Sequence, residues 1–444
     1  MEIPVIKVGI MAGQEILVTL EGRFLPEDRS LVVNGLCKFG KSESGIHLES
    51  NGKSWIFGDY IRLTPVNPET ARFVIHEVTI GLNFHWERKE NEVFKGSLEF
   101  IHDDEKIHAV NVLSIEDYLL SVISSEMSAT SSIEFLKAHA VISRSWLLAQ
   151  TQKNKSLQNE NHKYTTTFRT ENELIRWYDR EDHHLFDVCA DDHCQRYQGI
   201  TRATTPLIEQ SVQKTCGEVL IYNGLICDAR FSKCCGGITE LFENAWEPVN
   251  HPYLQRVVDN DSYPKELYRD LTLEREAADW IGDRPEVFCN SSDKNVLKQI
   301  LNDYDQETND FFRWKVVYTQ KELSELVKSR TGLDFGDIID LIPVKRGVSG
   351  RIIKLKIVGS LQTMIIGKEL EIRKSLSETH LYSSAFIIEK QGEDDAPQFI
   401  LHGAGWGHGV GLCQIGAAVM GDKGYTYDKI LAHYFPGAEL KMMY

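Results

Sequence analysis

The sequence lacks any run of 18 apolar residues, and it has no tract of low complexity. A membrane-spanning helix needs about 20 predominantly apolar residues, so we expect no transmembrane helix. The first residues, MEIPVIKVGIM, lack a basic stretch followed by an apolar core, and we expect no signal peptide there. The whole sequence is 42% hydrophobic and 26% charged, which is the composition of an ordinary globular protein.

Positive charge is in deficit. The 444 residues include 49 Lys and Arg against 65 Asp and Glu, which gives a formal net charge of -16. Proteins that bind nucleic acid neutralise phosphates with basic side chains, so this balance argues against a nucleic-acid partner. An anionic substrate would need a local basic patch.

The cysteines do not form the pattern of a disulfide framework. There are nine of them, an odd number at scattered spacings, whereas small disulfide-stabilised domains carry even sets at short intervals. We therefore expect at least one free thiol, and metal binding explains closely spaced cysteines better.

A helix is predicted from Ile115 to Met127, because its apolar residues recur at steps of three and four. Ser114 can cap its N-terminus. Glu126 falls on the apolar stripe near the C-terminus of the helix. Burial and the negative end of the helix dipole both favour a protonated carboxyl, which a general acid needs near pH 7. The alternative is a glutamate that reaches solvent or a lysine.

A second helix follows, with a predicted capping box at Ser131–Glu134 and an apolar stripe that runs to Leu147. Lys137 and Arg144 are seven residues apart and share another face of this helix. They form either a solvated face or a cationic wall next to Glu126.

Five potential soft or borderline metal ligands lie within twelve residues: His183, His184, Cys189, His193 and Cys194. Thiolate and imidazole together suit zinc. The alternative is a loop with reduced thiols and surface histidines. We predict zinc here, although the sequence does not show which histidines bind it.

A glycine-rich segment runs from His402 to Gly416. It is not a phosphate-binding loop, because no Gly-Lys-Ser/Thr follows and the Gly-x-Gly-x-x-Gly spacing is absent. Glycines let the backbone approach a ligand closely, and the segment presents four side chains that can bind a sugar: His402, Trp406, His408 and Gln414. The alternative is that the aromatic side chain only packs inside the turn.

The chain is long enough for two or three structural units. We predict an α+β fold with β-rich units, a helical catalytic segment and a discontinuous catalytic domain. The expected units are a β-rich N-terminal domain at 1–105, the first catalytic part at 106–260, an inserted α+β module at 261–380, and the second catalytic part at 381–444. Residues 151–180 are polar, and we expect a long loop with one short helical piece there.

Two blocks resemble the SpoIID/LytB family of bacterial sporulation and cell-wall proteins. The first joins Ser124–Met127 to Glu134–Ser145, and the second joins Gly405–Ala417 to His433–Gly437. Between them, shorter matches follow in the family's order: Gly236-Gly237, Trp246, Pro252–Leu254 and Gly347–Arg351. The resemblance covers about 105–444 and leaves the first hundred residues unassigned.

The resemblance implies a lytic transglycosylase that cleaves the β-1,4 bond between N-acetylmuramic acid and N-acetylglucosamine in peptidoglycan glycan strands and leaves a 1,6-anhydro sugar. The family's catalytic glutamate matches Glu126. In some members, Cys and His from the segment that corresponds to His183–Cys194 hold zinc near the cleft. The substrate also implies the cell envelope as the place of action.

Two other functions remain open from the sequence. Some relatives enhance a cell-wall amidase without being catalytic, which would make this chain a wall-binding partner of an amidase. The chain could instead be a thiol hydrolase, with Cys413 as nucleophile and His408 or His402 as base.

Overall fold

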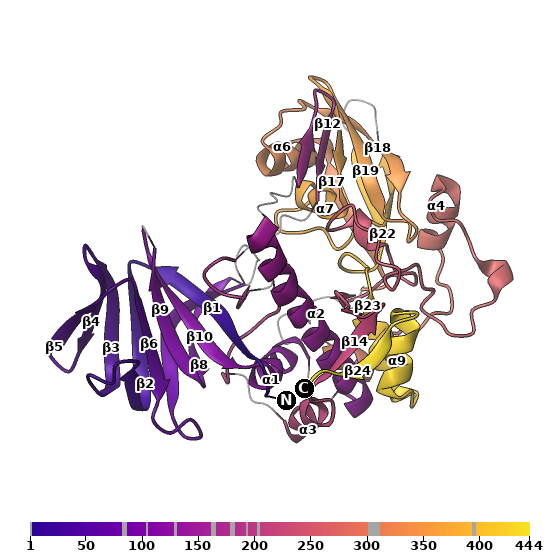
Figure 1. The fold of residues 1–444 in the computed structure, drawn as a ribbon. Coiled ribbons are helices and arrows are strands. Elements are labelled where there is room, and N and C mark those ends of the chain that lie inside the picture. The colour runs from indigo at the N-terminus through magenta and orange to yellow at the C-terminus, as the bar shows by residue number, and fades with distance from the viewer. Residues whose placement is uncertain are drawn as a thin grey trace.

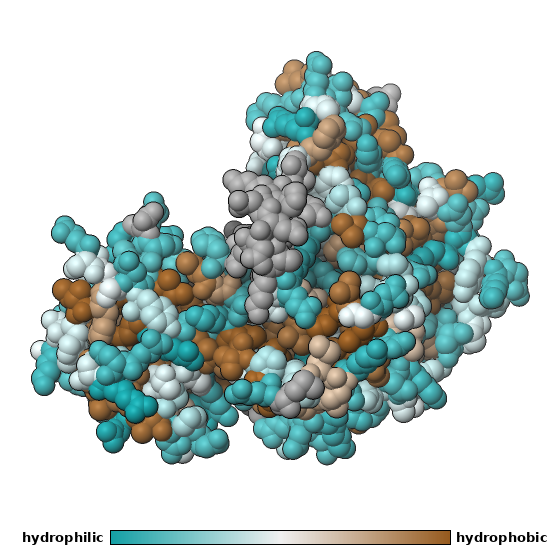
Figure 2. All heavy atoms as spheres, in the orientation of Figure 1, coloured by the Kyte–Doolittle hydropathy of each residue, from teal (hydrophilic) through white to brown (hydrophobic). Residues whose placement is uncertain are grey.

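The computed structural model describes residues 2–81, 87–103, 105–127, 131–160, 166–177, 183–191, 194–201, 205–300, 311–392 and 397–444. The fold is α+β, as predicted. In Figure 1, a sheet unit on the left and a smaller α+β unit at the top extend from a helical unit at the bottom, where both chain ends lie. In the same view, Figure 2 shows the sheet unit and the top unit as two lobes.

The sheet unit is built from residues near the N-terminus. Within the described residues it is an eleven-stranded sheet with the order β13-β1-β10-β9-β6-β2-β3-β4-β5, and β7 pairs with β2 and β8. Its strands are β1 (Val5–Gly13), β2 (Glu15–Pro26), β3 (Val33–Ser42), β4 (Gly45–Ser50), β5 (Lys53–Phe57), β6 (Tyr60–Pro65), β7 (Arg72–Ile80), β8 (Arg88–Phe94), β9 (Ser97–His102), β10 (Ile107–Ser114) and β13 (Val188–Cys189).

Alternating burial explains why these segments form strands. In β6, Ile61 and Leu63 are buried between more exposed neighbours, which is the period of a sheet with one covered face. Phe39 and Phe100 stack inside this unit with ring centroids 3.9 Å apart. The sheet continues through β10 to Ser114, beyond the predicted boundary at residue 105.

The helical unit surrounds one long helix, α2 (Ile133–Glu160). At 1.5 Å per residue this helix is about 42 Å long, and it contacts the other helices of the unit and β14. The elements around it are α1 (Ile115–Glu126), α3 (Pro206–Lys214), α8 (Gln414–Asp422), α9 (Tyr427–Tyr434), β14 (Glu218–Tyr222), β15 (Leu225–Ile226), β16 (Phe231–Ser232), β23 (Leu412–Cys413) and β24 (Glu439–Met442). The predicted loop at 151–180 is wrong at its start, because α2 continues to Glu160.

The top unit combines a five-stranded and a three-stranded sheet with two helices. Its elements are β11 (Thr167–Arg169), β12 (Glu173–Arg176), β17 (Arg313–Thr319), α6 (Gln320–Thr331), β18 (Ile338–Arg346), β19 (Ile352–Gly359), β20 (Thr363–Gly367), α7 (Glu369–Ser375), β21 (Phe386–Gln391) and β22 (Gln398–Ala404). They enclose a hydrophobic core of their own. Between this unit and the helical unit, the chain forms η1 (Phe242–Asn244), η2 (Lys265–Leu267), α4 (Glu274–Gly282) and α5 (Lys294–Ile300).

Strand pairing in the top unit crosses the predicted domain limits. β22 pairs with β17 across the predicted boundary at residue 380, and β12, which was expected to be part of a loop, pairs with β20. Both pairings join segments far apart in the sequence, so local composition did not reveal them. Among the described residues, no helix is long and apolar enough to cross a membrane.

Candidate functional site

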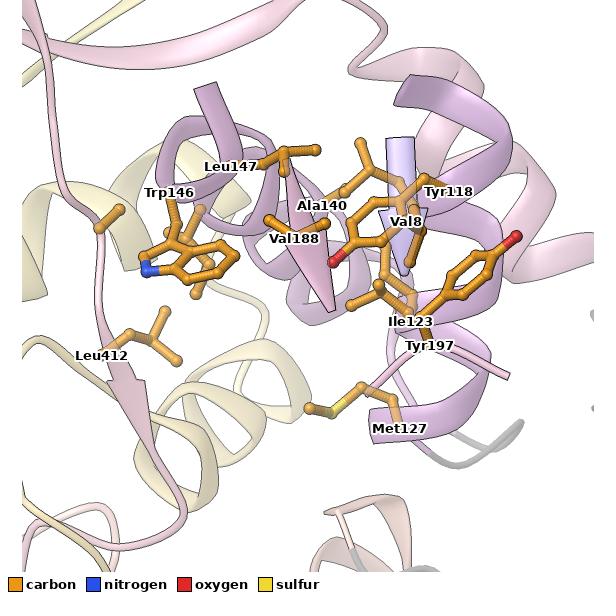
Figure 3. Packing of buried hydrophobic residues seen from close by; sticks show 14 of the residues in the cluster. Val8, Tyr118, Ile123, Met127, Ala140, Trp146, Leu147, Val188, Tyr197 and Leu412 are labelled. Carbon is orange, nitrogen blue, oxygen red and sulfur yellow. The ribbon is translucent and has the colours of Figure 1, made fainter. Parts of the chain in front are cut away.

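Glu126 is the last residue of α1, and its side chain is half-buried. The helix begins as predicted, because the Ser114 hydroxyl accepts a hydrogen bond from the Asp117 N–H at 3.1 Å. Its apolar face packs into the main core, where Figure 3 shows Tyr118, Ile123 and Met127 beside Tyr197. This packing fixes the end of the helix and therefore the position of the Glu126 carboxyl.

A backbone N–H reaches this carboxyl from another segment. The N–H of Arg196 donates to Glu126 Oε1 at 3.4 Å. Tyr118 lies on the same helix, eight residues before Glu126, and its ring stacks on Tyr197 with ring centroids 5.2 Å apart. Residues 194–197 thus run directly past the carboxyl end of α1.

Three of the five predicted metal ligands come together in this same segment: His183, Cys189 and Cys194, which we name the open donor group. Their ligand atoms all lie within 4.8 Å of one another, and all three side chains are half-buried. His183 Nε2 is 3.5 Å from Cys194 Sγ, and the Cys189 N–H donates to the same sulfur at 3.5 Å.

The other two predicted ligands stand apart. His184 is exposed and is not a member of the group that forms within the described residues. His193 lies outside the residues that the structure describes. One histidine and two thiols suit zinc, which binds such sets with a fourth position left open.

The open donor group and Glu126 share one neighbourhood. Burial, followed by the charges of Cys194 and Cys189, raises the pKa of Tyr118 well above its usual value, and Glu126 acts in the same direction. The pKa of the Cys194 thiol is also raised, by its hydrogen bond with Cys189 and then by burial. A cation at this place would favour the thiolate forms of the two cysteines, which burial and their mutual proximity disfavour.

A cationic and aromatic wall lies beyond the open donor group. The Arg230 guanidinium lies over the Trp246 ring, with its Cζ 4.4 Å from the ring centroid, and it forms an ion pair with Asp228 at 2.6 Å. Arg230 also interacts electrostatically with Cys194. The His408 ring meets the edge of Trp246 at 4.3 Å between centroids.

His408 is held neutral in this wall. Burial, together with the charges of Arg230 and Arg351, keeps the pKa of His408 well below its usual range. Its Nδ1 accepts a hydrogen bond from the Val410 N–H at 3.0 Å. The sequence therefore identified His408 but missed Arg230, for which no motif or spacing gave a signal. Trp246 was visible only as part of the family resemblance.

Arg144 is not part of an open cationic wall, contrary to one prediction. Its side chain is fully buried, and its guanidinium donates to both Glu116 oxygens at 2.8 and 2.7 Å. Glu116 lies in the first turn of α1, at the other end of the helix from Glu126. Lys137 is mostly covered as well and forms an ion pair with Glu134 at 2.6 Å.

Gln414 is also buried away from solvent, where it binds His139. The two Nε2 atoms are 3.2 Å apart, and His139 Nδ1 is 3.2 Å from the Ser143 hydroxyl. Burial lowers the pKa of His139 to about 3. The structure thus places the Gln414 amide in an internal network rather than beside Glu126.

Two further side chains of the glycine-rich segment have partners in the top unit and its surroundings rather than at Glu126. Trp406 stacks on Tyr382 with ring centroids 4.3 Å apart and also contacts Phe311. His402 lies on β22, where its Nε2 is 3.1 Å from a Glu389 oxygen on β21. The structure brings neither of them to Glu126 by any contact among the described residues.

The thiol-hydrolase hypothesis does not fit the structure. Cys413 is fully buried, so its sulfur cannot reach a substrate. Its neighbours are Cys234, Cys235 and Cys289, rather than the proposed bases His408 and His402. None of the nine cysteines, all of which lie in the described residues, forms a disulfide.

A pocket of about 450 Å³ opens next to the turn that carries Trp246. Its lining includes Glu243, Lys345 and Lys368. Burial, and then the charge of Lys345, lowers the pKa of Lys368 to about 8. The Lys368 amine lies over the Trp177 ring at 4.8 Å. Among the residues that line the pocket, Lys345, Arg346 and Lys368 carry positive charge.

These features define an α+β protein in which one carboxyl lies beside a group of potential metal ligands. Comparison with known proteins shows which families its parts resemble. Residues 103–222 match the SpoIID family, described as Stage II sporulation protein. Residues 240–411 match a Domain of unknown function (DUF8618). The first range contains Glu126 and the open donor group, and the second contains Trp246 and His408.

Named relatives agree with this assignment. The chain is 22% identical to Stage II sporulation protein D of Bacillus subtilis, over 75% of this chain and 76% of that protein. It is 24% identical to the Amidase enhancer of the same organism, over 72% of this chain but only 40% of that protein. An uncharacterized protein of Brachyspira hyodysenteriae is 27% identical over 78% of this chain and 72% of its own length. Residues 103–222 thus match the SpoIID domain, and about three quarters of the chain is similar to Stage II sporulation protein D.

Proposed function

We propose that this protein acts on the bacterial cell wall as a peptidoglycan lytic transglycosylase with Glu126 as its acid and base. The observation that carries the proposal is the half-buried Glu126 carboxyl at the end of α1, bound by the Arg196 N–H, within the residues that match SpoIID. The relatives named sporulation protein D and Amidase enhancer support a cell-wall role.

The chemistry needs one carboxyl that changes its protonation state. Glycoside hydrolases normally use two carboxylates, the second as nucleophile or as base for water. Here Glu126 gives its proton to the glycosidic oxygen as the bond from that oxygen to C1 of N-acetylmuramic acid breaks. The resulting carboxylate accepts the proton of the sugar's 6-hydroxyl while this oxygen bonds to C1. The product is a 1,6-anhydro ring, and Glu126 is protonated again.

The open donor group would hold a zinc ion beside this carboxyl. Its donor set, two thiols and one imidazole with mutual distances below 4.8 Å, fits tetrahedral zinc. A zinc ion would add positive charge to the site and fix the segment that begins at Cys194. Since the Arg196 N–H contacts Glu126, a fixed segment keeps this hydrogen bond in place.

The wall beyond the open donor group would bind the glycan. The Trp246 ring is stacked with Phe242 and contacted by Arg230 and His408, and a sugar would bind along this group of side chains. The pocket next to this turn carries Lys345 and Lys368, which can bind the carboxylates of muramic acid or of stem peptides. These residues replace Lys137 and Arg144 as the cations of the proposed cleft.

Mass spectrometry of digested glycan strands tests the proposal. Glu126→Gln keeps the size of the side chain but cannot exchange a proton, and we expect it to bind glycan while losing turnover by about 100-fold or more. The matched control is Glu209→Gln, the same change at an exposed carboxyl on α3. Wild-type turnover in Glu126→Gln would contradict the proposal. Reducing ends that carry oxygen from labelled water would show a hydrolase instead.

A second candidate rests on the relative named Amidase enhancer. In that case the protein would bind the cell wall and accelerate an amidase without cleaving glycan. Purified glycan strands would then yield no anhydro ends, whereas an added cell-wall amidase would release stem peptides faster. Glu126→Gln would leave this acceleration unchanged.

A further inference from the structure

A second set of metal-binding side chains lies inside the protein, away from solvent. It consists of Cys235, Asp259, Cys289 and Cys413, which we name the enclosed donor group. One ligand atom from each lies within 4.8 Å of all the others. All four residues are at most 2% exposed, so the group differs from a surface cluster of acids.

The sulfur distances match a metal site better than a disulfide. Cys235 Sγ and Cys289 Sγ are 3.7 Å apart, whereas a disulfide bond is about 2.05 Å long. Two thiolates bound tetrahedrally to one zinc at about 2.3 Å stand about 3.8 Å apart, by the geometry of the tetrahedron. The observed separation is therefore that of two corners of a zinc site.

Hydrogen bonds orient the donor atoms toward one another. The Cys235 N–H donates to Cys413 Sγ at 3.2 Å, and the Gly237 N–H donates to Cys235 Sγ at 3.4 Å. The two Asp259 oxygens accept from the Tyr434 hydroxyl at 2.5 Å and from the Cys289 N–H at 2.7 Å. Such outer contacts fix the ligands of protein metal sites.

Two features of the surrounding fold preserve this arrangement. Gly416 on α8 leaves space for the Asp259 carboxyl and the Tyr434 hydroxyl, because a Cβ at this position would clash with both. Arg313 is close enough to interact electrostatically with Cys289. Its charge would offset part of the negative charge that three thiolates and a carboxylate leave on a divalent ion.

We propose that the enclosed donor group binds one structural zinc ion, with Cys235, Asp259, Cys289 and Cys413 as its four ligands. Thiolates select zinc over magnesium or calcium, which prefer oxygen ligands. The compact spacing suits a single ion, because the ligands of an iron–sulfur cluster bind different iron atoms. Four protein ligands with no open position are typical of a structural site.

The ion would join four segments of the chain. Cys235 follows β16, and Asp259 lies between η1 and η2. Cys289 lies between α4 and α5, and Cys413 ends β23 where α8 begins. The adjacent Cys234 exchanges two backbone hydrogen bonds with Trp406, at 2.8 and 3.1 Å. The ion would therefore bind the glycine-rich segment directly at Cys413 and stabilise the neighbouring contact at Trp406, on the two sides of His408.

Zinc content of the full-length protein, purified without chelator, tests this proposal. We expect two zinc ions per wild-type chain and one in Cys189→Ser/Cys194→Ser, which removes only the open donor group. Cys289→Ser should lose one ion relative to Cys37→Ser, a control with an equally buried cysteine in the N-terminal sheet. No zinc in Cys189→Ser/Cys194→Ser would overturn the proposal.

X-ray absorption at the zinc edge keeps the test decisive if Cys289→Ser fails to fold. It is measured on Cys189→Ser/Cys194→Ser, in which the enclosed donor group is intact. We expect three sulfur atoms at about 2.3 Å and one oxygen at about 2.0 Å. A shell of four sulfurs would overturn the role of Asp259 in favour of Cys234. Iron in place of zinc, or a mass deficit that shows a disulfide, would overturn the site. None of these results depends on glycan cleavage.

Discussion

The open and the enclosed donor groups contain similar chemistry in very different surroundings. The open group is half-buried and has three donor atoms next to Glu126. The enclosed group is fully buried, has four donor atoms, and is surrounded by backbone N–H groups and the Tyr434 hydroxyl. Catalytic zinc sites keep an open position and structural sites do not. The same residue types can thus serve reactivity in one place and stability in another.

The same contrast in burial separates other polar side chains of the molecule. His139, Arg144 and Gln414 resemble the enclosed group, because each side chain is buried and paired inside the fold. Glu126 and His408 belong with the open group, since both are half-buried. We therefore expect changes in the buried set to alter stability, and changes in the half-buried set to alter activity at nearly constant stability.

The largest expected effect is the loss of stability in Arg144→Met. The change removes the buried guanidinium and leaves Glu116 without its cationic partner. Breaking a buried ion pair in this way destabilises proteins by about 3–5 kcal/mol. Urea unfolding measures the loss, and Arg275→Met, an exposed change on α4, serves as control. Turnover per folded molecule should stay within about twofold. A stable variant with weakened glycan binding would restore the original prediction of a cationic wall.

The next effect is a loss of stability at acid pH that depends on His139. Its pKa is about 3 in the folded protein against 6.5 for an ordinary histidine, so the unfolded chain binds one more proton between these values. The stability that the neutral imidazole contributes is complete above pH 6.5 and falls as the pH drops toward 3. Between pH 7 and 4.5 the loss amounts to about 2–3 kcal/mol.

Comparing wild type with His139→Gln by urea unfolding across this pH range isolates the contribution of the imidazole. In His139→Gln the free energy of unfolding should fall less between pH 7 and 4.5 than in wild type. His402→Gln, which changes a partly exposed histidine on β22, should follow wild type. Parallel curves for His139→Gln and wild type would show that this histidine is already charged in the folded protein.

Cys194→Ser tests the open donor group itself. We expect this variant to lose one zinc ion and to cleave glycan about 10–100-fold more slowly, the range seen when the surroundings of a metal site are altered. Its stability should fall by less than about 1 kcal/mol, because the side chain is only half-buried. Cys216→Ser, another half-buried cysteine, is the control. If Cys194→Ser unfolds globally, the open donor group also stabilises the fold, and the proposed distinction between a group for activity and a group for stability is wrong.

The smallest effect is expected for Lys137→Gln. Lys137 pairs with Glu134, and its amine lies over the Tyr427 ring at 5.2 Å. Such pairs near the surface contribute about 0–1 kcal/mol, and the KM for glycan strands should stay within about twofold. A tenfold rise in KM at unchanged stability would instead place Lys137 in the substrate site.

Local signals made part of the fold predictable. The Ser114 cap correctly predicted the start of α1. Local signals also mark α6, which begins at the capping box of Thr319 and Glu322 and ends at the glycine cap Gly332. The pairing of β12 with β20 was not predictable, because nothing in a strand of four residues identifies a partner almost 200 positions away.

The same contrast applies to the sites. The open donor group was predicted because its ligands fall within twelve residues of sequence. The enclosed group was missed, since Cys235 and Cys413 are 178 positions apart and only the folded chain brings them together. Arg144 was misinterpreted for a related reason, because its spacing from Lys137 was visible but its pairing with Glu116 was not.

The pairing of β1 with β13 has a consequence for how the chain assembles during synthesis. The Lys7 N–H donates to Asp187 Oδ2 at 2.8 Å across 180 positions, and Gly9 lies opposite Cys189. N-terminal parts of a protein emerge first and can fold as they appear. β1 can therefore pair with β10 early, while its outer edge stays exposed until β13 has been made. The outer edge of β1 is thus completed by a segment that is synthesised much later. Cys189 takes its final position only when β13 pairs with β1.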